Sequence, residues 1–344
     1  MTKAQPSRKR QELKQFSATA SLTQAELSFQ RGDYTNARDL LKHRIQRGVD
    51  DFRTRNLLGI SLANLGQFDE AEELFLQFKN QAKGRPQKDK AIFNLGLNRF
   101  FKDLSRYGDM SVTATLEATP TRNDQVLFPM GEPFLSAIET WKPLTRGKSP
   151  YQDHGNTFLS FAYLQFGDLD QALHHIANAI ANNENFFLAQ YVLGRLFLDL
   201  FWLANEGNDY LLPKDVAAFF EVEEEELIRT HGERVAVQAY TYLDIALQAF
   251  MAARSQAPTA IVVLNYLCQT FMLADMYEEA REALTVTESL APDWLSTLNL
   301  SLKFHESIQA PPDVIRALVK RIEIARRQDP IRRIFEVIPP HYLV

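Results

Sequence analysis

Apolar residues along this chain recur three and four positions apart, in short segments that come in pairs. The stretch Leu57 to Phe75 reads LLGISLANLGQFDEAEELF, with such spacing on both sides of Asn64–Leu65–Gly66. This pattern predicts two amphipathic helices joined by a tight turn. Gly32, Gly66 and Gly167 follow such first helices, where a glycine can take the left-handed conformation that ends a helix.

The pattern repeats with a period of 34 residues. Ala37 and Ala71 lie 34 positions apart, and so do Pro258 and Pro292. Small residues at matching places let the two helices of a pair approach closely, and prolines stop the second helix of several pairs. The small residues are Gly59, Gly96, Gly194 and Cys268 in first helices, and Ala37, Ala71, Ala172, Ala246 and Ala280 in second helices.

This frame resembles the tetratricopeptide repeat (TPR) family, whose units are helix pairs of 34 residues. The resemblance implies an all-α fold, a right-handed α-solenoid of about seven TPR-like hairpins with two insertions. The predicted organisation is a basic tail over 1–17, repeats one to three over 18–119, a proline-rich linker or loop over 120–150, repeats four to seven over 151–330, and a capping helix and tail over 331–344.

Two segments interrupt the repeats. The first, 120–150, contains five prolines and is expected to form one short helix at PFLSAIETWKPL. The second lies at about 206–234, because Ala246 stands where residue 206 was expected. We predict a helical insertion there, with one or two helices. Its acidic run Glu223–Glu226 indicates a solvated helix face rather than a metal site, since four successive acids point around a helix.

Composition agrees with a globular helical protein. Hydrophobic residues make up 45% and charged residues 24% of the 344 residues, and glycine is scarce. The single cysteine excludes an internal disulfide. The apolar stretch FFLAQYVLGRLFLDLFWLA contains Arg195 and Asp199, which would be costly inside a bilayer. We therefore expect a buried helix, no membrane insertion and a cytoplasmic protein.

The net charge of −5 makes nucleic acid an unlikely partner, because a dedicated nucleic-acid binder shows a basic face. The basic tail MTKAQPSRKRQELKQ leaves one alternative open, a regulator that contacts nucleic acid through residues 1–15. A second alternative is an enzyme with its site in the insertions, where Trp141, His154, His231 and the acidic run are the available side chains. The usual nucleotide, hydrolase and zinc-protease motifs are missing. We expect no catalytic residue, metal or cofactor.

The resemblance implies that the first helices line a concave groove for a partner polypeptide. In the family, the groove-facing positions are the second, fifth, ninth, twelfth and thirteenth of each repeat. Asparagines there can bond an extended peptide backbone, aromatic rings can take apolar side chains, and the cations can meet carboxylates. The candidate groove residues are Arg53, Asn56, Asn64, Lys90, Phe93, Phe100, His154, Thr157, Gln165, Tyr191, Arg195, Asp199, Asn265 and Gln269.

One specialised ligand is not predicted. TPR domains that bind the acidic tails of heat-shock chaperones use a two-carboxylate clamp of lysines, asparagines and an arginine. Here Leu22, Glu26 and Leu57 occupy clamp positions, and Asn94 stands in place of the arginine, so that only Lys90 matches. The clamp is therefore absent.

We predict a non-catalytic adaptor or chaperone that holds a protein or peptide partner in the groove. By analogy with the family, its setting is expected to be a bacterial secretion, pilus or motility assembly. Self-association is also open, because the apolar segment Ile331–Val344 could cap its own last repeat or dock in the groove of another copy.

Overall fold

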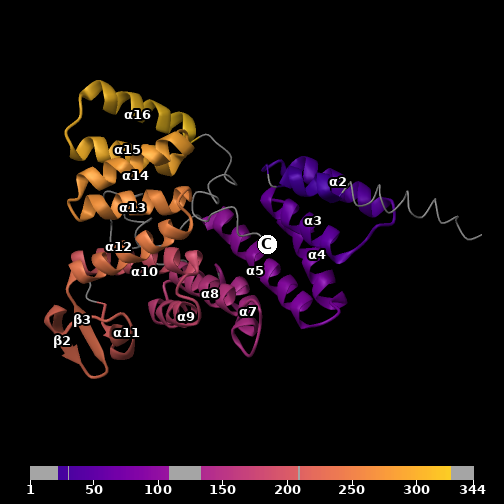
Figure 1. Ribbon diagram of the computed structural model, residues 1–344, viewed down its shortest axis with the longest axis horizontal. Helices are drawn as coiled ribbons and strands as arrows, with labels where there is room; N and C mark the ends of the chain where they lie inside the picture. Colours follow the sequence, from indigo (N-terminus) through magenta and orange to yellow (C-terminus); the bar gives the residue numbers. More distant parts are fainter. Residues whose placement is uncertain (1–21, 30, 108–132, 208–209, 327–344) are drawn as a thin grey trace, which may run out of the picture. The chain divides into compact units, whose positions relative to one another are not determined.

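Helix pairs account for most of the computed structural model, which describes residues 22–29, 31–107, 133–207 and 210–326. The chain divides into two compact units between Lys102 and Asp103. Each unit is described separately below (Figure 1). The all-α solenoid expected from the repeats is confirmed, apart from a small sheet in the second unit.

The described part of the first unit contains five helices in sequence, and the last of them runs on past Lys102 into the second unit. Residues 22–29 are helical, and α2 (Tyr34–Gln46), α3 (Phe52–Asn64), α4 (Phe68–Gln81) and the long α5 (Arg85–Tyr107) follow. α3 packs against both α2 and α4. The helices share one buried core, which includes Leu41, Leu58, Ala71, Phe75 and Leu95.

Gly59 and Phe75 show why a small residue is needed in the first helix of a pair. A Cβ atom added at Gly59 would lie 2.7 Å from Phe75 Cε1, closer than carbon atoms can pack. The glycine therefore lets the ring of α4 lie directly on the backbone of α3. The predicted role of this position is confirmed.

The first two pairs are connected by a buried arginine. Arg44 of α2 donates to Thr54 Oγ1 at 2.8 Å and to the Asp51 carboxylate at 3.0 Å. Asp51 is also the N-cap of α3, since it accepts from the Thr54 amide at 2.8 Å. One carboxylate thus accepts hydrogen bonds both from the first turn of α3 and from a buried cation of α2. These bonds fix the position of the start of α3 relative to α2.

The second unit continues with α7 (Leu135–Trp141), a 3₁₀ helix η1 (Lys142–Thr145), and the pair α8 (Gln152–Phe166) and α9 (Leu169–Asn182). The short helix predicted at PFLSAIETWKPL is therefore confirmed as α7, which packs on α8. The next pair is α10 (Phe187–Asn205) with α12 (Ala239–Gln256), followed by α13 (Ile261–Leu273) with α14 (Tyr277–Leu290), and α15 (Leu295–Ser307) with α16 (Pro312–Ala325). In Figure 1 the last pairs lie stacked on one another.

The segment between α10 and α12 corrects our prediction of a helical insertion. Its described residues form one short helix, α11 (Lys214–Phe219), and a 3₁₀ turn η2 (Glu224–Glu226), but also three strands. These are β1 (Leu212–Pro213), β2 (Leu227–His231) and β3 (Arg234–Val237), in the antiparallel order β1-β3-β2. His231 pairs with Arg234 across a two-residue turn whose Gly232 has a φ of 60°. A glycine first in the turn suits a β-hairpin, and Ile228, Thr230, Val235 and Val237 supply strand-forming residues.

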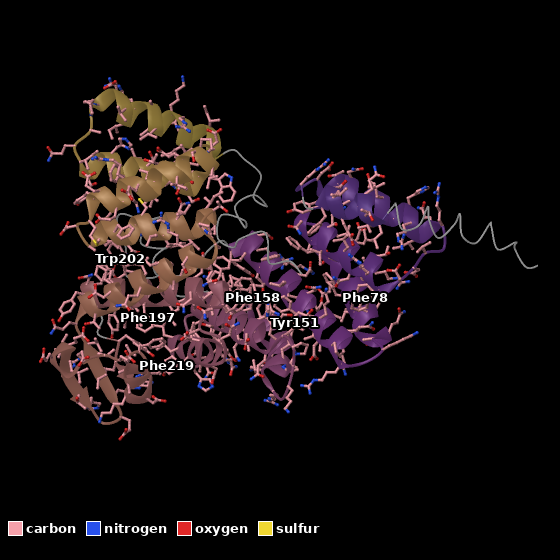
Figure 2. All side chains as sticks on the ribbon, in the orientation of Figure 1. Phe78, Tyr151, Phe158, Phe197, Trp202 and Phe219 are labelled. Carbon is pink, nitrogen blue, oxygen red and sulfur yellow. The ribbon has the colours of Figure 1, made fainter. Side chains whose placement is uncertain are left out.

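The insertion is attached to the helices by aromatic and polar contacts. Phe220 lies 4.9 Å from Phe197 of α10, ring centre to ring centre, and the same distance from Phe219. Phe197 and Phe219 are labelled in Figure 2. On the neighbouring helix α9, Asp170 accepts hydrogen bonds from Tyr210 and from Arg234. Burial and the Asp170 carboxylate raise the pKa of the Tyr210 hydroxyl above its usual range, so the phenol stays a donor.

Several sequence predictions lie outside the described residues. These are the basic tail over 1–17, the second helix of repeat three over 108–119, the first part of the proline-rich segment, and the capping helix over 331–344. The turn predictions can be tested. Gly32, Gly66 and Gly167 all have positive φ angles, of 76°, 72° and 85°. The expected left-handed helix ends are therefore confirmed.

Candidate functional site

The first helices of the second unit lie side by side. α10 contacts α8 and α13, and α13 contacts α15. We call the surface formed by α8, α10, α13 and α15 the first-helix face. Because residues three and four apart share one side of a helix, the repeat frame places its candidate positions along this face.

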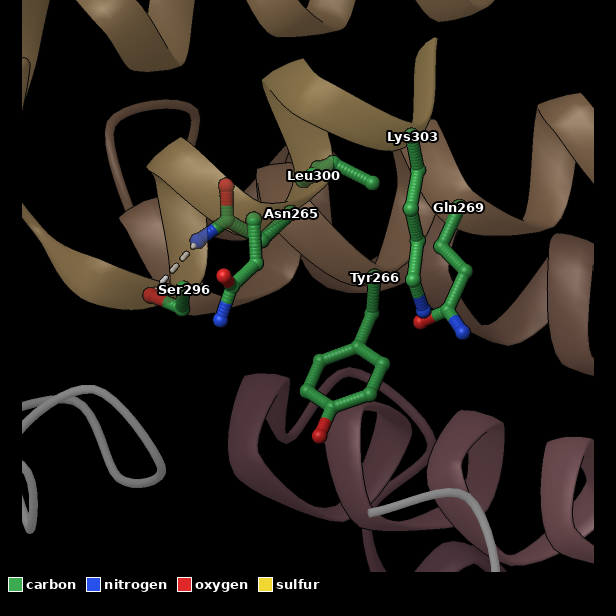
Figure 3. A pocket seen from close by; sticks show the side chains of 7 residues that line it. Asn265, Tyr266, Gln269, Ser296, Leu300 and Lys303 are labelled. Carbon is green, nitrogen blue, oxygen red and sulfur yellow. Dashed lines mark hydrogen bonds between the residues drawn. The ribbon is translucent and has the colours of Figure 1, made fainter. Parts of the chain in front are cut away.

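A pocket of about 80 Å³ opens on this face between α13 and α15 (Figure 3). That volume is room for a few water molecules or one side chain. Most of the residues that line it carry polar but uncharged groups, and Lys303 adds one positive charge. The residues that line it are Asn265, Tyr266 and Gln269 of α13, and Ser296, Asn299, Leu300 and Lys303 of α15.

Asn265 connects the two helices at one end of the pocket. Its Nδ2 donates to Ser296 Oγ at 3.2 Å and lies 3.4 Å from Thr297 Oγ1. Its Oδ1 is buried and has no hydrogen-bond partner. A buried acceptor without a donor costs about 1–3 kcal/mol, and this cost belongs to the packing of α13 against α15, because the oxygen has almost no accessible surface.

The polar residues of the pocket match the dimensions of an extended polypeptide. Asn265 and Gln269 lie one turn apart on α13, while Ser296, Asn299 and Lys303 span two turns of α15. At 1.5 Å per residue, the run from 296 to 303 is about 10 Å long. An extended segment covers this length with about three residues, since each rises roughly 3.3 Å. The amides can therefore meet successive backbone groups of one strand.

Arg195 takes a different position from the one expected of a groove cation. Its guanidinium carbon lies 5.0 Å from the centre of the Phe161 ring and 4.9 Å from that of Tyr266. The side chain is only 1% exposed. The arginine therefore stacks between rings of α8 and α13, a cation–π arrangement that joins three successive first helices. Tyr191 belongs to the same cluster, with ring centres 5.9 Å from Tyr266 and 6.3 Å from Phe161.

Most of the candidate groove residues are buried in this structure. The four with partly or fully exposed side chains are Arg53, Lys90, His154 and Gln269. The buried ones are Asn56, Asn64, Phe93, Phe100, Thr157, Gln165, Tyr191, Arg195, Asp199 and Asn265. Of the whole set, the pocket brings together only Asn265 and Gln269. Contact of the others with a partner stays a prediction.

In the first unit, three of the candidates, Arg53, Asn56 and Lys90, lie near Asn94 on α3 and α5. Asn94 Nδ2 donates to Asn56 Oδ1 at 2.7 Å, which joins the two helices. Arg53 forms an ion pair with Glu26 at 2.6 Å, although its side chain is 72% exposed. Burial lowers the pKa of the neighbouring Lys90, and the positive charge of Arg53 lowers it further.

Sequence reasoning missed five pocket residues, and three of these, Ser296, Asn299 and Lys303, lie at groove-facing positions of the frame. They occupy the second, fifth and ninth positions of the repeat that begins at Leu295. The same frame that selected Asn265 and Gln269 would have found them, had it been extended to the seventh repeat. Tyr266 and Leu300 lie at a position that the frame does not count as groove-facing.

Other candidate chemistry has ordinary structural surroundings. Cys268 is fully buried, and burial raises the pKa of its thiol to about 12, so it packs as a small apolar residue. Among the described residues, no three His, Cys, Asp or Glu side chains are grouped so that they could hold a metal ion. Over the same residues, α10 alone is long and apolar enough to cross a membrane, yet 78% of that window is buried within the protein.

Comparison with known proteins gives similarity in structure only. No family model matches the chain, and no curated protein matches it. Among solved structures, a tetratricopeptide repeat protein from Parabacteroides merdae superposes with a TM-score of 0.45 at 11% identity, over 89% of this chain and 99% of that one. A human IFIT1 dimer with m7Gppp-AAAA gives 0.47 at 13% identity, over 91% and 70%. YrrB, described as a TPR protein with an unusual peptide-binding site, gives 0.29 at 14%, over 83% and 91%. The assignment of TPR-like hairpins therefore rests on the helix pairs of this chain.

Proposed function

We propose that this protein is a non-catalytic interaction scaffold that holds an extended segment of a partner polypeptide on the first-helix face. The observation that carries the proposal is the pocket between α13 and α15, with amides from both helices. Amide side chains both donate and accept, so they suit a peptide backbone whose groups alternate in the same way.

Tyr266 offers an aromatic surface at the pocket, where it can pack against an apolar side chain of the partner. The proposed adaptor or chaperone role, a cytoplasmic location and a bacterial secretion, pilus or motility assembly come only from the resemblance to the TPR family.

Site-specific photo-crosslinking tests this proposal. A photoreactive residue at Asn299 places the probe in the pocket, and the same residue at the exposed Ser289 of α14 is the matched control. We expect a partner polypeptide to be cross-linked from position 299 and not from position 289. The cross-linked partner fragment, identified by mass spectrometry, should bind as a synthetic peptide.

Two further variants decide whether the pocket is responsible. Gln269→Ala and Lys303→Ser change side chains that line the pocket, and both should weaken binding of that peptide. Far-ultraviolet circular dichroism of each variant shows whether the fold is retained. If the peptide binds both folded variants as tightly as the original chain, the pocket is not the binding site.

A further inference from the structure

We infer that the open edge of the small sheet pairs two copies of this chain, with β2 of one copy adding antiparallel to β2 of the other. The inference goes beyond the scaffold role and uses neither the pocket of α13 and α15 nor the C-terminal segment. The two edges of the sheet differ. β1 has only two residues, and its Pro213 has no N–H to offer a further strand. β2 has five residues and no proline, so it is the edge that can accept one.

The outer side of β2 is exposed. Among the described strands, β2 has a neighbour on one side only, since the sheet order is β1-β3-β2. Its residues from 228 to 231 are all exposed, and Ile228 reaches 60%. Figure 1 shows β2 at the outer edge of the sheet, on the side away from α11. An exposed edge strand of this kind is a template for another strand.

Thr230 directs its backbone N–H and C=O to this open side. Across the sheet it pairs with Val235, which pairs in turn with Leu212 of β1. Lys214 donates its N–H to the Glu233 carbonyl at 3.0 Å. Hydrogen-bonded and non-bonded pairs alternate along antiparallel strands, so Leu212 and Val235 form the next hydrogen-bonded pair. Because the peptide groups of Val235 face β1, those of Thr230 opposite it face away from β3.

The charges along β2 favour a second copy as the added strand. Glu225 and Glu226 precede β2, and Arg229 lies within it. Antiparallel strands bring the start of one beside the end of the other, so a two-fold axis near Ile228 places Glu225 of each copy close to Arg229 of the other. The same axis brings the two exposed Ile228 side chains together and removes apolar surface from water. A parallel pairing of the same residues would oppose like charges.

The contact is expected to be small. The bulge between Leu227 and Arg229 interrupts the regular spacing of β2 and keeps the paired stretch short. A few residues from each chain bury less than the roughly 1,200 Å² of the smaller stable interfaces, so we expect a dissociation constant of about 10–100 μM. Sedimentation equilibrium of the full chain over this concentration range should show a mass that rises from that of one chain toward that of two.

Thr230→Pro tests the role of the strand edge. It removes an N–H that β3 does not use, so the variant should stay folded and self-associate about tenfold more weakly. Circular dichroism of the variant checks the fold.

Arg229→Glu and Glu225→Arg test the antiparallel arrangement. Each variant alone brings like charges together twice and should self-associate about tenfold more weakly than the original chain. An equal mixture of the two should recover the association, because each then meets the opposite charge on the other. Glu282→Arg is the control, since it reverses an exposed charge on α14 and should leave the association unchanged.

Several outcomes would overturn the inference. These are a chain that stays monomeric up to about 1 mM, association that a folded Thr230→Pro variant retains in full, or a mixture of the two charge variants that associates no better than its components. Pairing of β2 with a strand of a different protein, in place of a second copy, would also overturn it. These results are independent of the cross-linking at Asn299, so failure of either proposal leaves the other to its own experiment.

Discussion

The ring of Phe250 lies so close to Gly194 that a Cβ atom on residue 194 would be 2.6 Å from Phe250 Cε1. The two residues belong to α10 and α12, which pack together although the β-containing insertion separates them in sequence. The contact repeats that of Gly59 with Phe75 in the first unit. A close approach at this position is therefore a property of the hairpin and not of its connecting loop.

Gly194→Ala should destabilise the protein by about 1–3 kcal/mol, because the added methyl group must displace a packed ring. A loss of stability would be informative, because alanine in place of a helical glycine ordinarily stabilises a protein by about 1 kcal/mol. Chemical denaturation measures the change. The double variant with Phe250→Leu should recover part of the loss, whereas strictly additive effects of the two substitutions would show that they do not share this contact.

The sequence frame predicted these helix pairs because small residues and turn residues are set by local geometry. Ala246 was correctly assigned to α12 across the insertion. The hairpin of β2 and β3 was missed, because the helical period was continued into a segment where strand-forming residues flank His231–Gly232. That signal was present in the sequence.

The candidate site could be predicted less completely than the fold. The frame identifies the side of a helix on which a residue lies, but not how deeply neighbouring side chains cover it. Arg195 illustrates this difference, since Phe161 and Tyr266 enclose it from two other helices. The hydrogen bond between Asn56 and Asn94 likewise depends on how α3 packs against α5. The spacing of residues within one helix does not predict that packing.

Gln309→Gly should stabilise the last pair of helices. Gln309 lies in the turn between α15 and α16 with a φ of 53°, where the turns after α3 and α8 have Gly66 and Gly167. A non-glycine residue pays about 1 kcal/mol or more for this conformation, partly offset by the greater flexibility of glycine when unfolded. We expect a gain of about 0.5 kcal/mol, measured as a higher unfolding midpoint. Gly66→Ala, at a φ of 72°, should have the opposite effect.

Asp170→Asn should loosen the insertion from α9 while leaving the helix pairs folded. The carboxylate accepts from both Tyr210 and Arg234, and a neutral amide would weaken the charge-assisted bond to the guanidinium. Hydrogen exchange should become faster over residues 210–237 and stay unchanged in α13 to α16. Glu139→Gln, which removes an ion pair with Lys142 elsewhere in the unit, is the control. Equal rates of hydrogen exchange over residues 210–237 in the two variants would contradict the role of Asp170 in attaching the insertion to α9.

His175 should make the protein sensitive to mild acid. Burial lowers the pKa of its imidazole to about 4, with smaller contributions from the charges of His174 and Lys142. The ring stacks on Tyr163 at 5.6 Å, and its Nδ1 lies 3.0 Å from Asn156 Oδ1, as a neutral ring donating an N–H would. In the unfolded chain the pKa returns to about 6.5.

The direction of the pH effect follows from proton binding. Below pH 6.5 the unfolded chain takes up a proton that the folded protein resists, so stability is complete above about 6.5 and falls as the pH drops toward 4. The loss attributable to His175 should reach roughly 2–3 kcal/mol. His154, whose pKa burial also lowers, should add to it in the same direction.

Urea denaturation of the original chain and of His175→Gln, between pH 7 and pH 4, measures this effect. Glutamine can still donate to Asn156 but does not titrate. As the pH falls, the original chain should therefore lose more unfolding free energy than the variant, and the difference between the two proteins should narrow or reverse. The exposed His43→Gln is the control and should follow the original chain throughout. If the His175→Gln curve runs parallel to that of the original chain, a neutral buried imidazole is not the source of the acid sensitivity.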